Sequence, residues 1–179
     1  YALTDDATNA DHKMRQVVTV SVGTVVTFAV VVKAGTAGYV WLYDGYANTG
    51  KHFNLATQSS ITSIGTAPTA FSTADLGNGW VMCTITYTAS TSTRPELGMS
   101  INGSTPNYIG SGSTVLVDAA GLFQGTYTAQ QILDAGGIPL TTSAAASNPS
   151  AGKYSWSFDG SNDSLLTGNL GITNTVTVV

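Results

Sequence analysis

The stretch that decides the fold is Val25-Val26-Thr27-Phe28-Ala29-Val30-Val31-Val32-Lys33. Successive side chains of a strand point to opposite faces, so the even-numbered residues from Val26 to Val32 share one face and the odd-numbered residues from Val25 to Val31 share the other. Both faces are apolar. This pattern predicts a central strand, with other elements packed on both sides of its sheet.

Short runs with the same alternation recur along the chain, separated by Gly, Ser, Asn and Pro. They cover residues 16–21, 39–43, 52–55, 80–88, 97–102 and 114–118. A parallel sheet would need helical crossovers of a dozen or more residues between strands, and the chain has no room for them. The sequence therefore predicts an all-β fold, an antiparallel two-sheet sandwich, with one or two helical turns at residues 128–133 as its exception.

The composition agrees with this class. Of 179 residues, 42% are hydrophobic, only 9% are charged and 20 are Gly. Helical surfaces are normally built from Glu, Lys, Arg and Gln. A chain with this low content of charged residues therefore favours strands. We expect the sandwich to occupy residues 1–140, a linker of small polar residues to follow at 141–152, and residues 153–179 to begin a second, incomplete β unit.

Charge argues against a nucleic-acid partner, and hydropathy argues against insertion into a membrane. The net charge is −4, and the six Lys and Arg residues are scattered, so we expect no nucleic-acid partner, which would require a basic stripe. No apolar run approaches the roughly 20 residues of a transmembrane helix, so we expect no membrane insertion.

Aromatic side chains suggest where a ligand would bind. Tyr39, Trp41 and Tyr43 occupy one face of a predicted strand, and Tyr46 and His52 follow it closely. Sugar rings stack on aromatic planes, so these five residues are the candidate carbohydrate-binding site. A stripe of this kind is also typical of a core or of a subunit interface, and both interpretations stay open at this point.

The sequence offers few candidate catalytic residues. Cys83 lies in an apolar strand pattern without a nearby base, and His12 lies in a polar stretch. The acidic residues fall mostly in turn-like settings and suggest no glycosidase pair. Asp5, Asp6 and Asp118 carry oxygens that calcium prefers, but such residues more often bend or cap the chain. We expect no catalytic residues, no metal and no cofactor.

Three stretches carry a resemblance to a known family: Leu3-Thr4-Asp5-Asp6-Ala7 with His12 soon after, the stretch from Val25 extended through Ala34-Gly35, and Asn78-Gly79-Trp80-Val81-Met82-Cys83. Together they resemble the carbohydrate-binding-module-like jelly roll of bacteriophage head-spike, head-fibre and tail proteins, over roughly residues 1 to 125. Separately, the opening strand of laminin-G or concanavalin-like lectin domains is resembled by the run Trp156-Ser157-Phe158-Asp159-Gly160-Ser161-Asn162-Asp163-Ser164-Leu165.

The resemblance implies a galactose-binding-like jelly roll in a non-enzymatic structural or adhesion module of a virion protein, exposed at the particle surface. It further implies a homotrimer, other virion proteins as partners and contact with a host-surface glycan. The alternative is a carbohydrate-binding module of a secreted bacterial enzyme, which would be monomeric.

Overall fold

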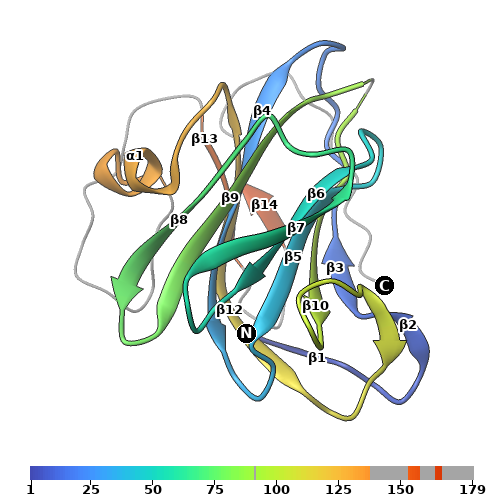
Figure 1. The fold of residues 1–179 in the computed structure, drawn as a ribbon. Helices are drawn as coiled ribbons and strands as arrows, with labels where there is room; N and C mark the ends of the chain where they lie inside the picture. The colour runs from blue at the N-terminus through green and yellow to red at the C-terminus, as the bar shows by residue number, and fades with distance from the viewer. Residues whose placement is uncertain (91, 138–152, 158–163, 167–179) are drawn as a thin grey trace.

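A computed structural model describes residues 1–90, 92–137, 153–157 and 164–166. Its strands form two antiparallel sheets packed face to face, with a small two-stranded sheet beside them (Figure 1). The prediction of an all-β antiparallel sandwich is confirmed.

The larger sheet has seven strands in the order β14-β13-β12-β4-β9-β8, and β1 also pairs with β12. Its strands are β1 (Ala2–Thr4), β4 (Val25–Ala34), β8 (Ala70–Gly77), β9 (Trp80–Thr88), β12 (Thr114–Gln124), β13 (Lys153–Ser157) and β14 (Ser164–Leu166).

The smaller sheet has five strands in the order β3-β10-β5-β6-β7. Its strands are β3 (Lys13–Arg15), β5 (Tyr39–Asp44), β6 (Thr49–Asn54), β7 (Ser59–Gly65) and β10 (Pro95–Ser100). The two-stranded sheet pairs β2 (Asn9–Asp11) with β11 (Asn107–Ile109).

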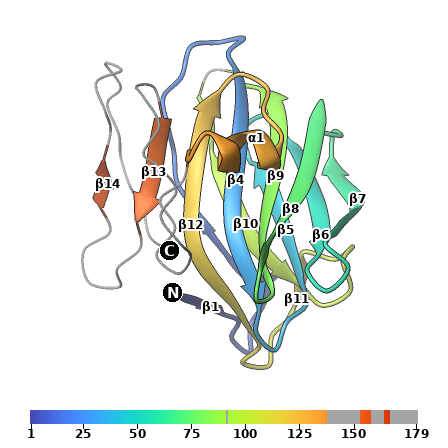
Figure 2. The same cartoon turned by 90° about the vertical axis from the view of Figure 1, so that its left-hand side faces the viewer.

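β4 is the central strand that the sequence predicts, because it pairs with β12 on one side and β9 on the other. One of its faces, with Phe28 and Val30, belongs to the main core between the sheets. The other face, with Ala29 and Val31, is covered by the helix α1 (Ala129–Asp134), which lies on the outside of the seven-stranded sheet (Figure 2). Both faces of β4 are therefore buried, one by the opposite sheet and the other by α1.

The predicted helical turns at residues 128–133 are confirmed. Thr128 caps α1: its hydroxyl accepts from the backbone N–H of Gln131, and the Gln131 side chain accepts from the backbone N–H of Thr128. The helix has six residues, and no helix in the described ranges is long and apolar enough to cross a membrane.

Two parts of the strand prediction are wrong. Residues 16–21 form no strand, because Val18 makes only an isolated bridge to Thr93. The sequence prediction also omits the three-residue strands β1, β2, β3 and β11, which are too short to show alternation. It omits two longer strands as well, β7 and β8, whose runs are rich in Ser, Thr and Ala and alternate weakly in hydropathy. Both lie at sheet edges, where one side of the strand meets solvent and apolar alternation is less necessary.

Asp5 holds the N-terminal segment against the loop before β12. Its Oδ1 accepts from the backbone N–H groups of Ser111, Gly112 and Ser113 at 2.7 to 2.9 Å, and its Oδ2 accepts from the Tyr108 hydroxyl at 2.9 Å. Burial alone would raise the pKa of Asp5, but these hydrogen bonds hold it below its ordinary value. This carboxylate is thus engaged by donors of the protein itself.

The end of the chain adds two strands to the larger sheet. β13 pairs antiparallel with β12, and β14 pairs with β13. The predicted linker at 141–152 and most of the predicted second unit at 153–179 lie outside the described residues, so the second unit stays a prediction.

Candidate functional site

The smaller sheet presents one face to the core and the other outward. Val40, Leu42 and Phe53 point into the core, so their neighbours on β5 and β6 point away from it. We call this outward side of β3, β10, β5 and β6 the outer face. Its cross-strand rows are Lys13, Gly98, Trp41 and His52, and then Arg15, Glu96, Tyr43 and Gly50.

Trp41 lies across the neighbouring strand rather than standing up from the sheet. A Cβ placed on Gly98 would come within 2.1 Å of the indole Cζ2, so the ring rests on the glycine backbone. The indole N–H donates to the Met99 carbonyl at 2.9 Å, and the Lys13 ammonium lies 5.6 Å from the ring centre. Only 2% of Trp41 is exposed, so this ring offers no open plane to a ligand.

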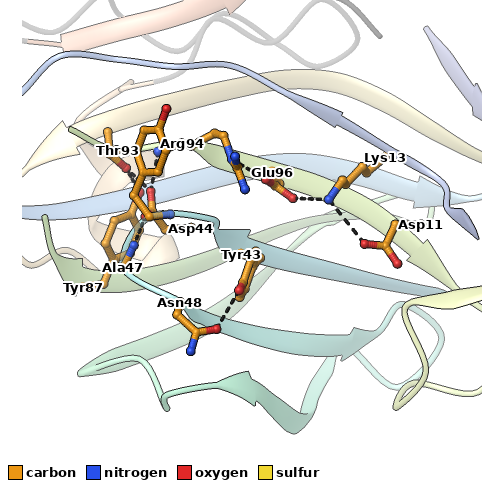
Figure 3. Close-up of polar contacts among 11 residues, drawn as sticks. Asp11, Lys13, Tyr43, Asp44, Ala47, Asn48, Tyr87, Thr93, Arg94 and Glu96 are labelled. Carbon is orange, nitrogen blue, oxygen red and sulfur yellow. Dashed lines mark hydrogen bonds and ion pairs between the residues drawn. The ribbon is translucent and has the colours of Figure 1, made fainter. Parts of the chain in front are cut away.

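Tyr43 leans the opposite way and rests on Gly50, where an added Cβ would lie 2.7 Å from its Cδ2. Its hydroxyl donates to Asn48 Oδ1 at 2.7 Å (Figure 3). Burial, and then the nearby Glu96 carboxylate, raise the pKa of this hydroxyl above its ordinary value, so it stays protonated as a donor. The side chain is half-buried, with part of its surface in solvent.

The other end of β5 is covered. Gly103, in the loop after β10, lies against Tyr39 and against Ile61 of β7, and its carbonyl accepts from the Thr62 hydroxyl at 3.0 Å. His52 is fully buried, and neither ring nitrogen has a hydrogen-bond partner within the described part of the chain. Burial lowers the pKa of His52 to about 4, so the ring is neutral at pH 7.

A row of alternating charges crosses the outer face (Figure 3). Glu96, whose side chain is 0% exposed, contacts Arg94 Nε through Oε1 and Lys13 Nζ through Oε2, both at 2.7 Å. Lys13 also reaches Asp11 at 3.3 Å. A buried carboxylate is stable only with such partners, so Glu96 fixes the positions of the two cations that flank it.

Arg94 is held on three sides. Its Nε donates to Glu96, its guanidinium carbon lies 5.1 Å from the centre of the Tyr46 ring, and its Nη2 packs on Gly45, where a Cβ would come within 2.2 Å. The side chain is 28% exposed, and Tyr46 is 45% exposed. An oriented guanidinium therefore lies beside an open aromatic ring.

The buried Asp44 joins the loop that carries Tyr46 to the segment that carries Arg94. Its Oδ1 accepts from the backbone N–H groups of Tyr46 and Ala47 at 2.9 and 2.6 Å. Its Oδ2 accepts from the backbone N–H of Arg94 at 2.6 Å and from the Thr93 hydroxyl. One carboxylate thus sets the distance between the ring and the guanidinium.

The five residues predicted as a site are divided by the fold. Tyr43 and Tyr46 lie at the open end of the outer face, Tyr39 lies half-buried at the covered end, and Trp41 and His52 are buried between them.

The sequence prediction did not include Arg94, Glu96, Lys13 or Arg15 in the site. The signal that marks them is the spacing Lys13-x-Arg15 and Arg94-x-Glu96, because residues two apart on a strand share a face. Among the described residues, no group of three His, Cys, Asp or Glu side chains lies close enough to hold a metal ion.

The chain is an all-β antiparallel sandwich whose smaller sheet carries an aromatic and charged outer face. No family model matches the chain, and no curated protein matches it.

Proposed function

We propose that this chain is a non-enzymatic adhesion module of a bacteriophage virion protein, and that it contacts glycans of the host surface through the open end of the outer face. The observation that carries the glycan part is the pair Tyr43 and Tyr46. Both residues keep exposed surface beside polar groups, whereas Trp41 and His52 are buried and Tyr39 packs against the loop around Gly103. Aromatic planes bordered by polar groups, here Asn48 and Arg94, suit a sugar, whose C–H face stacks and whose hydroxyls form hydrogen bonds.

The fold supports a jelly roll of the carbohydrate-binding-module type. The chain passes repeatedly between the sheets: β4 lies in the larger one, β5 to β7 in the smaller one, β8 and β9 in the larger one again, and β10 in the smaller one. Such alternation is a feature of jelly rolls. The virion assignment rests on the resemblance of the first 125 or so residues and on the threefold fibres and spikes typical of that family.

The polar groups favour binding over catalysis. Both oxygens of Glu96 are engaged by cations, and Cys83 is fully buried with the pKa of its thiol raised by burial. Neither is arranged as a general acid or as a nucleophile, which would need access to a substrate.

The test is a glycan array probed with the 179-residue chain and with Tyr46→Ala and Tyr43→Ala. We expect the wild type to bind at least one surface glycan and each variant to lose roughly 10-fold in affinity, the range for one stacked ring. Tyr127→Ala is the matched control, because Tyr127 is 42% exposed but follows β12 of the other sheet. Absence of binding, or equal losses in all three variants, would refute the proposal.

Native mass spectrometry separates the virion proposal from its alternative. A trimer supports a fibre or spike module. A monomer that still binds glycan would overturn the virion assignment and favour a carbohydrate-binding module of a secreted bacterial enzyme.

A further inference from the structure

We infer that the ligand of the outer face is an anionic glycan, one that bears carboxylate or sulfate groups, and that Arg94 and Arg15 select it. This inference rests on the proposed glycan binding and adds the class of sugar. It starts from the distribution of charge. The chain has net charge −4, yet three of its six Lys and Arg residues, Lys13, Arg15 and Arg94, lie at one end of the outer face, where the carboxylates of Asp11 and Glu96 pair with two of them.

Arg94 has the geometry of a receptor for an oxyanion. Glu96 uses only its Nε, while the Tyr46 ring and the Gly45 backbone fix the plane of the guanidinium. Within the described part of the chain, no hydrogen bond or ion pair engages its two Nη groups. A planar fork with free N–H donors pairs with two oxygens of a carboxylate or sulfate, and a fork that is already fixed loses little entropy on binding.

Arg15 adds a second cation on the same face. It is paired in register with Glu96 across β3 and β10, so the side chains of the two residues lie on the same side of the sheet. No hydrogen bond or ion pair of its side chain is found among the described residues, and it is partly exposed. Glu96 and Asp11 balance the charges of Arg94 and Lys13, so Arg15 is the cation of this group that has no ion-pair partner among the described residues.

Tyr46 makes a sugar the favoured carrier of this anion. The Arg94 guanidinium lies over the Tyr46 ring, and Tyr46 is 45% exposed, so a pyranose that packs against the exposed part of this side chain lies beside the Nη groups. A nucleic acid is disfavoured, because its affinity depends on many phosphate contacts along a basic stripe, whereas this patch is small and the rest of the chain is acidic.

The experiment compares matched pairs of probes by isothermal titration calorimetry. The pairs are oligogalacturonate with its methyl ester, sialyllactose with lactose, and a sulfated oligosaccharide with its unsulfated parent. We expect at least one acidic member to bind roughly 10-fold more tightly than its neutral partner. We also expect its affinity to fall as salt is raised. The pair that responds identifies carboxylate or sulfate.

Three variants test the residues. Arg15→Gln removes no contact of the fold seen among the described residues, and it should weaken the acidic member while it changes the neutral member less than about 2-fold. Arg94→Lys keeps the charge but loses the fork, so it should weaken the acidic member more than the neutral one. Lys33→Gln is the control, since it removes one positive charge from β4 of the other sheet.

Each outcome decides one proposal. Equal binding of acidic and neutral members refutes the anionic class while glycan binding stands. Binding of none of the probes, together with a silent glycan array, refutes glycan binding itself. Equal weakening by Arg15→Gln and Lys33→Gln shows a general charge effect and overturns the role of the outer face. Binding of single-stranded DNA as tightly as the acidic glycan would overturn it too.

Discussion

The arrangement of Trp41 on Gly98 predicts a measurable coupling between two positions. The perturbations are Trp41→Ala, Gly98→Ala and the double variant. Trp41 is 2% exposed and donates its N–H to the Met99 carbonyl, so its removal leaves a cavity and a carbonyl without its partner. We expect Trp41→Ala to lower the free energy of unfolding by about 3 to 5 kcal/mol.

Gly98→Ala acts on the same ring from the other side. The new Cβ would lie 2.1 Å from the indole Cζ2, so the ring must move off its resting place. Overpacking of this kind lowers stability by about 1 to 3 kcal/mol. In the double variant the ring is absent and the methyl group occupies part of the space left by it. The combined loss should then be smaller than the sum of the single losses by about 1 to 2 kcal/mol.

The assay is urea unfolding followed by far-UV circular dichroism, which does not depend on the tryptophan that is removed. Losses that add within about 0.5 kcal/mol would refute the contact between the ring and Gly98. A loss below about 1 kcal/mol in Trp41→Ala would refute its burial and restore Trp41 as an exposed sugar platform.

Three further predictions concern buried polar groups. His52 has a pKa of about 4 in the folded protein and about 6.5 in the unfolded chain, so between these pH values the unfolded state binds one more proton. The free energy of unfolding should therefore fall as the pH drops from about 6.5 to about 4. If His52→Gln shows the same dependence of unfolding free energy on pH as the wild type, this reasoning is wrong. Asp5→Asn weakens four hydrogen bonds to a charged acceptor and should lower stability by about 1.5 to 3 kcal/mol, with faster amide exchange at Ser111; normal exchange there would count against the anchor. Cys83 is fully buried, so a thiol reagent should modify it no faster than the chain unfolds, and rapid labelling of the native protein would disprove that burial.

The sequence predicted the elements whose pattern is dictated by burial. β4 and β9 lie at the middle of the larger sheet and are buried on both faces, so their runs are apolar or β-branched nearly throughout and stand out in the sequence. The edge strand β7 escaped prediction because Ser, Thr and Ile alternate there without a clear apolar face. Hydropathy reports burial and says little about strands that face solvent.

The candidate site was predicted only in part, and for a physical reason. The alternation in β5 places Tyr39, Trp41 and Tyr43 on one face, but it does not reveal which rings are covered. Coverage depends on Gly98 and on the loop around Gly103, which lie far away in sequence. The charges were missed because a buried carboxylate such as Glu96 is unfavourable alone and becomes stable only when the fold brings two cations to it.

The central place of β4 has a consequence for how the protein is made. β4 ends at Ala34 and leaves the ribosome well before its partner β12, which begins only at Thr114. At translation rates of about 5 to 20 residues per second, a strand that is apolar on both faces waits roughly 4 to 18 s for that neighbour. During this interval it can pair with β9 at most, and its open edge is available to other nascent chains. Codon choice between β9 and β12, or a chaperone that binds apolar strands, should therefore govern the yield of soluble protein more strongly than any single contact in the finished sandwich.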